Sequence, residues 1–180
     1  MPDILLVEDK ESLRRVLRLT LENAGYSVVE AADAREAMFA RVLERARAFR
    51  WAVEGPRSID RVNIRRASLA AMARAVSGLA VRAELVLVDG IDSIPGVASP
   101  QQTVVDGDAK LLSIAAASVL AKVVRDRIMM RLDGVWPGYG FARHKGYGTP
   151  EHLDALDRLG PCPLHRFSFT PVCVLELPLA

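Results

Sequence analysis

Residues 85–90 read Leu-Val-Leu-Val-Asp-Gly, and this stretch carries the clearest structural signal in the chain. Four consecutive branched apolar residues are typical of a strand that is buried on both faces of a parallel sheet. The run ends at Asp89 and Gly90, a charged residue and a turn residue. The stretch therefore predicts a buried strand whose carboxyl end carries a carboxylate.

Short apolar runs of the same kind lie on both sides of this stretch. They predict strands at residues 4–7, 26–29, 49–53 and 103–105. Amphipathic or alanine-rich segments between and after them predict helices at residues 12–23, 34–48, 58–78, 113–131 and 150–159. This order predicts an α/β fold with three layers, in which helices cover both faces of a central sheet of about five strands. The Gly-, Pro- and aromatic-rich part after residue 134 predicts an irregular, partly helical C-terminal extension.

Composition narrows the class of protein further. The 180 residues are 51% hydrophobic and 26% charged, which excludes a globally disordered chain. The uncharged stretch at 111–121 is much shorter than the roughly 18 residues of a membrane span, and the acidic first residues do not resemble a signal peptide. Cys162 and Cys173 are too few for a disulfide framework and lack metal-ligand spacing. We therefore expect a cytoplasmic protein without a membrane partner.

The net charge of +2 conceals an uneven distribution along the chain. Residues 1–38 contain eight acids and five bases, whereas residues 39–180 contain fourteen acids and nineteen bases. An excess of basic residues is typical of proteins that bind polyanions such as nucleic acids. A general preference for arginine, in a chain with four lysines, would produce the same excess without any such function.

Carboxylates follow three of the predicted strands. Glu8 and Asp9 follow the first strand, Asp89 follows residues 85–88, and Asp106 and Asp108 follow residues 103–105. Carboxyl ends of neighbouring parallel strands meet at one edge of a sheet, where repulsion between carboxylates is relieved by a divalent cation. Oxygen ligands favour Mg²⁺ or Mn²⁺. A metal site at this edge is one interpretation; solvated loop residues are the other.

Four segments of the chain resemble a known family. They run IDRVNIRRASLAAMARAV (59–76), LVLVDG (85–90), GDAKLLSIAAASVLAKVVRDR (107–127) and WPGYGFARHKGYGTPEHLDALDRLGPCPLHRFSF (136–169). Together they make residues 39–172 similar to bacterial ribonuclease HII. That resemblance implies a ribonuclease H-like core and two-metal cleavage of RNA in RNA–DNA hybrids, or of ribonucleotides embedded in a DNA duplex, with Mg²⁺ or Mn²⁺ as cofactor.

The resemblance also implies roles for individual residues. Asp89 in the VDG motif and Asp108 in the GDAK motif match the third and fourth catalytic acids of the family. Tyr147 in the GYGT motif matches the tyrosine that stacks on the sugar beside the ribonucleotide. The positions that match the nucleic-acid path are Lys110, Arg143, His144 and Lys145.

The N-terminal part of the chain departs from this family. The family begins with a strand that ends in an Asp-Glu pair, followed by a Gly-Arg-Gly turn that reads the ribose 2′-hydroxyl, and neither occurs here. Residues 1–38 instead resemble the start of a response-regulator receiver domain, in the segments ILLVED (4–9), LRRVLRLTLENAG (13–25) and YSVVEAADAREAM (26–38). The resemblance implies that Glu8 and Asp9 bind Mg²⁺. It also implies a chimera, with the two parts joined near residues 36–45.

We expect a receiver-like segment, 1–38, and a ribonuclease HII-like segment, 39–180, to form one joint domain. Its first strand would lie beside the strand that carries Asp89, so that Glu8 and Asp9 replace the missing acidic pair and complete a catalytic metal site with Asp89 and Asp108. We expect nuclease activity that is weak or lost. The alternatives are a receiver-like module that accepts phosphate on Asp89, and an engineered fold without activity. An exposed sheet edge would allow a homodimer.

Several smaller signals have a plain structural interpretation. We expect the three histidines, His144, His152 and His165, to be surface or capping residues, and Arg127 to be solvated on its helix. A phosphate contact is the alternative for His144, because Arg143 and Lys145 flank it. Trp136 and Tyr139 either stack on bases or seal a small core.

Overall fold

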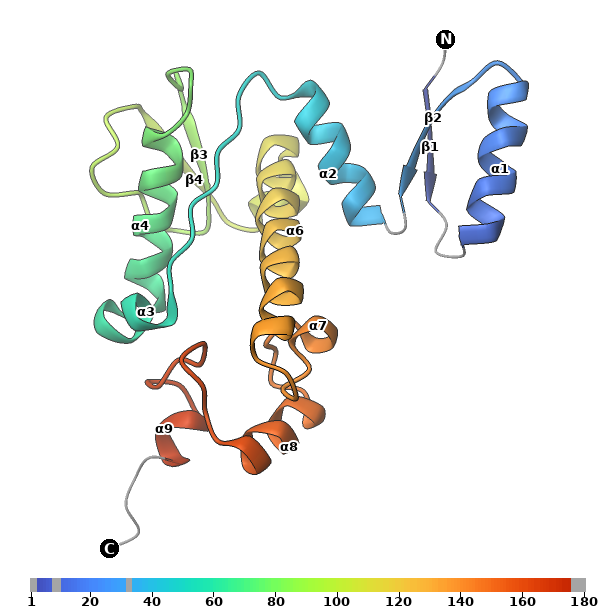
Figure 1. Cartoon of the computed structure of the whole chain (residues 1–180). Coiled ribbons are helices and arrows are strands. Elements are labelled where there is room, and N and C mark those ends of the chain that lie inside the picture. Colours follow the sequence, from blue (N-terminus) through green and yellow to red (C-terminus); the bar gives the residue numbers. More distant parts are fainter. Residues whose placement is uncertain (1–2, 8–10, 32–33, 176–180) are drawn as a thin grey trace, which may run out of the picture.

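The computed structural model describes residues 3–7, 11–31 and 34–175 (Figure 1). Its strands are β1 (Asp3–Val7), β2 (Ser27–Ala31), β3 (Val86–Asp89) and β4 (Gln101–Val104). The helices before β3 are α1 (Glu11–Asn23), α2 (Ala34–Arg45), α3 (Pro56–Val62) and α4 (Ile64–Ser77). Those after β4 are α5 (Gly107–Lys110), α6 (Leu112–Val135), α7 (Phe141–His144), α8 (Pro150–Leu159) and α9 (Val172–Leu175). Helices at 12–23, 34–48, 113–131 and 150–159 were predicted within a few residues of these bounds.

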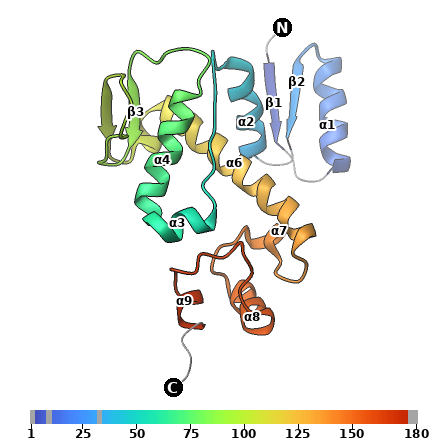
Figure 2. The same cartoon turned by 60° about the vertical axis from the view of Figure 1, so that its left-hand side comes forward.

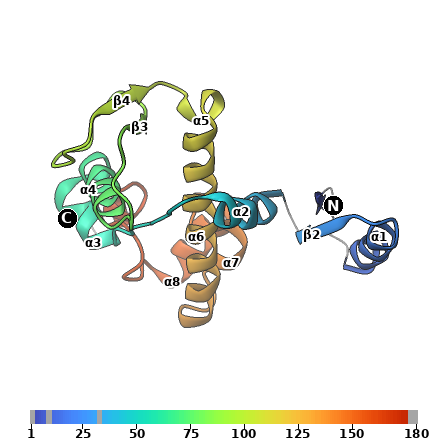
Figure 3. The ribbon, with the colours of Figure 1, turned by 90° about the horizontal axis from the view of Figure 1, so that it is seen from above.

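The strands form two separate parallel sheets. Strand β1 pairs with β2, with Asp3 opposite Ser27, and β3 pairs with β4, with Asp89 opposite Val104. The prediction of one central sheet of about five strands is therefore wrong for the part of the chain that the structure describes. Helix α2 explains the separation, because it lies between the β1–β2 sheet and helix α6 in all three views (Figures 1, 2 and 3).

The strand predicted at residues 49–53 is an extended segment without a sheet partner. Phe49 and Trp51 stack on each other, with ring centroids 6.0 Å apart. The guanidinium of Arg74 on α4 donates to the carbonyl of Val53 at 2.7 Å and pairs with Glu54 at 2.6 Å. A side chain from α4 thus takes the place that a neighbouring strand would have had at Val53.

The single helix predicted at residues 58–78 is two helices, divided at Asn63. The backbone of Asn63 has φ 70° and ψ 164°, which is neither helical nor extended, and its side chain accepts a hydrogen bond from the N–H of Arg66 at 3.0 Å. Asparagine is a strong N-cap and its backbone here is not helical, so the residue ends α3 and begins α4. Periodicity could not show this break, because the apolar positions continue through it.

In the part of the chain that the structure describes, most of the buried hydrophobic side chains form three clusters. The first joins α2 to α6 through Phe39, Leu120 and Val123. The second places Val86 and Val88 of β3 against α4. The third fills the C-terminal extension with Tyr139, Phe141, Ala155, Leu156, Cys162 and Val172.

The C-terminal extension is irregular and partly helical, as predicted. Tyr139 stacks on Phe141 with centroids 5.2 Å apart, so it seals a small core and does not stack on bases. Asp60 of α3 ties the extension to the rest of the chain, because its carboxylate accepts from the N–H groups of Phe167 and Ser168 at 2.9 and 3.0 Å. Among the described helices, none is long and apolar enough to cross a membrane.

Candidate functional site

Asp89 is the last residue of β3 and the first element of the candidate site. Val86 and Val88 point into the core, whereas Asp89 is exposed at the carboxyl end of the strand. One carboxylate oxygen, Oδ1, accepts a hydrogen bond from the backbone N–H of Gly107 at 2.9 Å. This bond orients the carboxylate and links the end of β3 to the turn that follows β4.

The turn after β4 brings a second carboxylate to the same edge. Asp106 adopts a left-handed conformation with φ 53°, and the chain then enters the short helix α5, which carries the exposed Asp108. A Cβ on Gly107 would lie 2.5 Å from Cδ1 of Ile114 and 3.3 Å from Oδ1 of Asp89. A side chain at position 107 would therefore have to displace the end of the Ile114 side chain and crowd the Asp89 carboxylate slightly.

These carboxylates have the chemistry of a hard-cation site. Mg²⁺ in proteins is commonly held by one or two carboxylates together with water and substrate phosphates, so Asp89 and Asp108 fit such an ion as a partial ligand set. A group of three or more potential metal ligands does not occur among residues 3–7, 11–31 and 34–175. Lys110 at the end of α5 donates its ammonium to the carbonyl of Val105 at 2.6 Å, which braces the turn.

Glu8 and Asp9, the other two predicted ligands, lie outside the described residues. Strand β1, which precedes them, is described: it pairs with β2 and lies on the other side of α2 from β3 (Figure 3). The prediction that the first strand lies beside the Asp89 strand is therefore wrong. The cause is the packing of α2 against both partners, which fills the space beside α6.

Tyr147 lies in a loop beside the middle of α6. Its side chain is 59% exposed, and the guanidinium carbon of Arg125 lies 4.3 Å from the centre of its ring. Arg125 also donates to the carbonyl of Lys145 at 2.8 Å. An exposed aromatic ring supported on one face by a cation is suited to stacking on a sugar or base.

The basic residues predicted for the nucleic-acid path have different surroundings. Arg143 is exposed and forms an ion pair with Glu151. Lys145 is half-buried, and its ammonium donates to the carbonyl of Ala142. Both lie within four residues of Tyr147 in the sequence, and each already has an intramolecular partner with which nucleic acid would compete.

His144 is buried, contrary to the expectation of a surface residue. Its Nε2 lies 2.7 Å from the carbonyl of Tyr139, and its Nδ1 accepts from the N–H of Gly146 at 3.1 Å. Both ring nitrogens are thus bonded within the loop, and no nitrogen remains for a phosphate.

All three histidines gather around Phe141, which the sequence analysis did not predict. The rings of His144 and His152 stack with centroids 4.3 Å apart, and Nε2 of His152 lies 3.1 Å from Nε2 of His165. Burial lowers the pKa of His152 and of His165, and the neighbouring histidines lower them further. The spacing of the three along the chain follows neither a helical nor a strand period, so no local signal could have placed them together.

Arg127 was predicted to be solvated on its helix, and in the structure it also contacts two residues of α2. Its guanidinium carbon lies 4.4 Å from the ring centre of Phe39, and its NH2 donates to Glu36 at 2.6 Å. It therefore holds α2 on α6.

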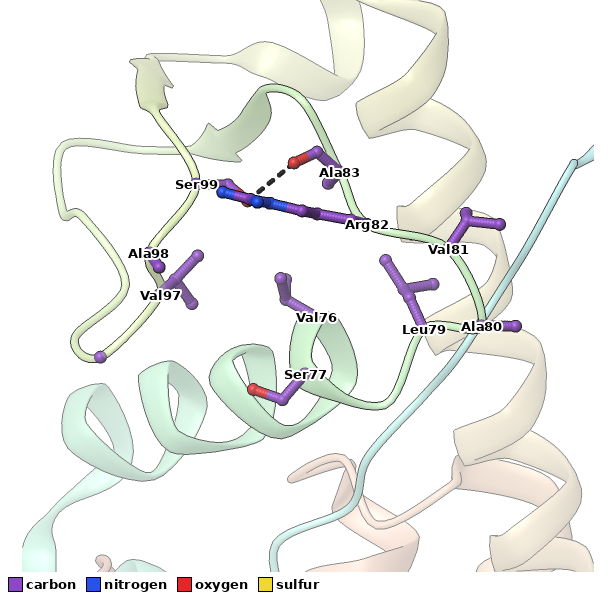
Figure 4. A pocket seen from close by; sticks show the side chains of 11 residues that line it. Val76, Ser77, Leu79, Ala80, Val81, Arg82, Ala83, Val97, Ala98 and Ser99 are labelled. Atoms are coloured by element: carbon purple, nitrogen blue, oxygen red, sulfur yellow. Dashed lines mark hydrogen bonds between the residues drawn. The ribbon is translucent and has the colours of Figure 1, made fainter.

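A pocket at the end of α4 lies apart from these residues. Figure 4 shows its lining, in which Arg82 is the one charged residue and Ser99 donates to the carbonyl of Ala83 at 2.7 Å. The lining contains no carboxylate or imidazole, so it offers no ligand for a metal ion.

Comparisons with known proteins agree on one family. The family described as Ribonuclease HII matches residues 11–172. The ribonuclease HII of Rhizobium leguminosarum bv. trifolii (strain WSM2304) is 49% identical over 146 residues, which cover 81% of this chain and 63% of that protein. The ribonuclease HII of Agrobacterium fabrum (strain C58 / ATCC 33970) is 51% identical over 138 residues, covering 77% of this chain and 63% of that protein.

The chain thus spans less than two thirds of the length of these curated relatives. The family match includes residues 11–38, most of the segment that resembles a receiver domain, and the matches give no support to a receiver or a chimera. By the match over residues 11–172 and the identity to its relatives, the chain belongs to the ribonuclease HII family.

Proposed function

We propose that this chain is an endonuclease of the ribonuclease HII type, which cleaves RNA in RNA–DNA hybrids or at ribonucleotides within a DNA duplex. The observation that carries the proposal is the hydrogen bond between Asp89 and Gly107, because it brings the Asp108 turn to the end of β3. Family membership supports the same activity, since relatives that are identical at about half of the aligned residues are named ribonuclease HII.

The proposed roles of the residues follow from their positions. Asp89 and Asp108 would hold the cation, and the N–H of Gly107 keeps Oδ1 of Asp89 in place so that Oδ2 can face the ligand. When bound, Mg²⁺ or Mn²⁺ supplies activation of the attacking water and stabilisation of the leaving 3′ oxygen. Tyr147 offers its exposed ring to a sugar or base, and Arg143 and Lys145, close to it in the sequence, would contribute positive charge. Lys110 adds positive charge next to Asp108.

We propose that the activity is weak or lost. The Gly-Arg-Gly turn that would recognise the 2′-hydroxyl is absent from the sequence, and β1 pairs with β2 on the far side of α2 from Asp89. A displacement of about 1 Å in a catalytic group already costs on the order of a hundredfold in rate. Roles for Glu8 and Asp9 as metal ligands stay a prediction.

The direct test is cleavage of a labelled DNA duplex that contains one ribonucleotide, first in Mg²⁺ and then in Mn²⁺. We expect slow cleavage, or none, by the wild-type chain and none by Asp89→Asn, with an all-DNA duplex as the substrate control. Asp154→Asn, an exposed acid on α8, is the matched protein control. Cleavage that survives in Asp89→Asn would contradict the proposed site. Absence of both cleavage and duplex binding by the folded wild-type chain would contradict the proposed function.

A receiver-like role for residues 1–38 is a second candidate, favoured by one observation. Strands β1 and β2 are parallel, with α1 as their connection, which is the topology expected of the first units of a receiver. Phosphate transfer to Asp89 has no such support, because β3 lies in the other sheet. A beryllofluoride-dependent rise in melting temperature with Mg²⁺ would favour this candidate, and no rise would exclude a phosphoacceptor.

We also propose that residues 1–38 and 39–180 share one domain. Helix α2 crosses the boundary between them, and its Phe39 packs against Leu120 and Val123 of α6.

A homodimer stays a prediction that two short sheets with outer edges would permit. Light scattering after size-exclusion chromatography would distinguish a monomer from a dimer.

A further inference from the structure

Arg125 on α6 contacts the Tyr147 loop at two points. Its guanidinium lies over the Tyr147 ring at 4.3 Å, and its NH2 donates to the carbonyl of Lys145 at 2.8 Å. A planar guanidinium can stack on a ring and donate in its own plane at the same time, which a lysine ammonium cannot do. The arginine therefore fixes both the ring and the backbone that precedes it.

The backbone that precedes Tyr147 needs such support. Lys145 and Gly146 have positive φ angles of 53° and 77°, and a left-handed lysine is disfavoured by its Cβ. The N–H of Tyr147 donates to the carbonyl of His144 at 2.9 Å, which closes the turn. The hydrogen bond from Arg125 reaches the carbonyl of the left-handed lysine itself.

The turn also lies close against α6. A Cβ on Gly146 would be 3.2 Å from Cε of Met129, one helical turn after Arg125. Arg125 and Met129, four residues apart, thus lie on the same face of α6, and α7 packs against this helix (Figure 1). The loop therefore packs against α6 on one side, while the Tyr147 side chain is 59% exposed on the other.

We infer that Arg125 is a positioning residue for Tyr147: it presents the tyrosine ring to nucleic acid in a fixed orientation. This inference rests on the proposed function, in which Tyr147 contacts the duplex. A ring held in advance loses little conformational freedom on binding, so the arginine strengthens binding without contacting the nucleic acid. The competing role for an arginine at this place is a direct phosphate contact.

A first experiment needs no nucleic acid. Aromatic NMR with labelled tyrosine reports three rings, Tyr26, Tyr139 and Tyr147, and Tyr147→Phe assigns the third. We expect Arg125→Met to shift the Tyr147 signal and leave that of Tyr139 in place, which also shows that the C-terminal core is folded. Arg125→Lys, which keeps the charge, should shift it as well. A Tyr147 signal that is unchanged in both variants would overturn the inference.

A second experiment separates positioning from phosphate contact. Fluorescence anisotropy, in EDTA and over a range of salt concentrations, measures binding of a labelled duplex that contains one ribonucleotide. We expect Arg125→Met to weaken binding by about threefold to thirtyfold, the range of a cation–π contact. The double variant with Tyr147→Ala should bind no more weakly than Tyr147→Ala alone, because the arginine acts through the ring. Arg131→Met, the same change on an exposed residue of the same helix, is the control.

The outcomes are distinct. If the losses of binding free energy in the two single variants add up in the double variant, and the salt dependence of the affinity falls by about one ion when Arg125 is removed, the arginine contacts a phosphate. That result would overturn the inference. Duplex binding that is unchanged in Tyr147→Ala would overturn it too, while leaving the nuclease proposal intact. No binding by the wild-type chain would overturn the inference alone if the chain still cleaves the duplex with metal present, and both proposals if it does not.

Discussion

Asp89 accepts a hydrogen bond from Gly107 across 18 residues of chain, and this bond joins the end of one strand to the turn after the next. The two residues pack so closely that a Cβ on Gly107 would also lie 2.5 Å from Cδ1 of the buried Ile114. Gly107 thus leaves room at the candidate site for both the Asp89 carboxylate and the Ile114 side chain.

Substitution Gly107→Ala should lower the free energy of unfolding by about 1–3 kcal/mol, because the new methyl group overlaps Ile114. Ile114→Val removes the overlapping Cδ1, so the double variant should lose less than the sum of the two single variants. Urea unfolding measures all three. Additive losses would show that the overlap at Ile114 is not the cause.

Substitution Asp89→Asn should weaken Mn²⁺ binding by on the order of tenfold or more, because a negative charge is removed while the amide oxygen can still accept from Gly107. Isothermal titration calorimetry measures the affinity, and Asp108→Asn should behave in the same way. Asp154→Asn on α8 removes an exposed carboxylate elsewhere and should bind like the wild type. Equal loss in that control would indicate general surface charge instead of a site.

The buried histidines should make the fold sensitive to mild acid. Burial holds the pKa of His152 and of His165 below the ordinary 6.5, so the unfolded chain takes up protons before the folded one. The free energy of unfolding is therefore highest above about pH 6.5. It falls as the pH drops below this value, until the pH reaches the pKa of these histidines in the folded chain.

Thermal unfolding between pH 8 and pH 5 tests this effect. A hydrogen bond from Arg65 lowers the pKa of Asp92, so this carboxylate stays ionised between pH 8 and pH 5. Its titration therefore does not change the stability in this range. A melting temperature that stays constant from pH 7 to pH 5 would contradict the prediction.

Truncation of Phe39 should loosen the N-terminal segment. Phe39→Ala removes the ring that packs against Leu120 and Val123 and supports Arg127, at a cost of about 3–5 kcal/mol. Met38→Ala, at a residue that is 41% exposed, is the matched control and should cost much less. Limited proteolysis should cleave the Phe39 variant between α2 and α3 first. Equal cleavage rates in both variants would show that Phe39 does not hold α2.

Local elements could be predicted from the sequence, and their assembly could not. The strand at residues 85–88 was predicted from a single apolar run, and the helix at 150–159 was predicted within the irregular C-terminal part. The break at Asn63 escaped because a cap inside an apolar pattern leaves that pattern intact. The predicted sheet order was wrong because an apolar run indicates that a strand is buried but does not indicate which elements cover it or which strand it pairs with.

The sequence by itself determined the family, most of the helices and strands, and the two carboxylates at the end of β3 and in α5, since these depend on residue type and near neighbours. The tertiary structure alone decided that α2 separates the two sheets, that three distant histidines share one core, and that Arg125 supports Tyr147. Such contacts join residues far apart in the chain, and packing in three dimensions selects them among many pairs of equal chemistry.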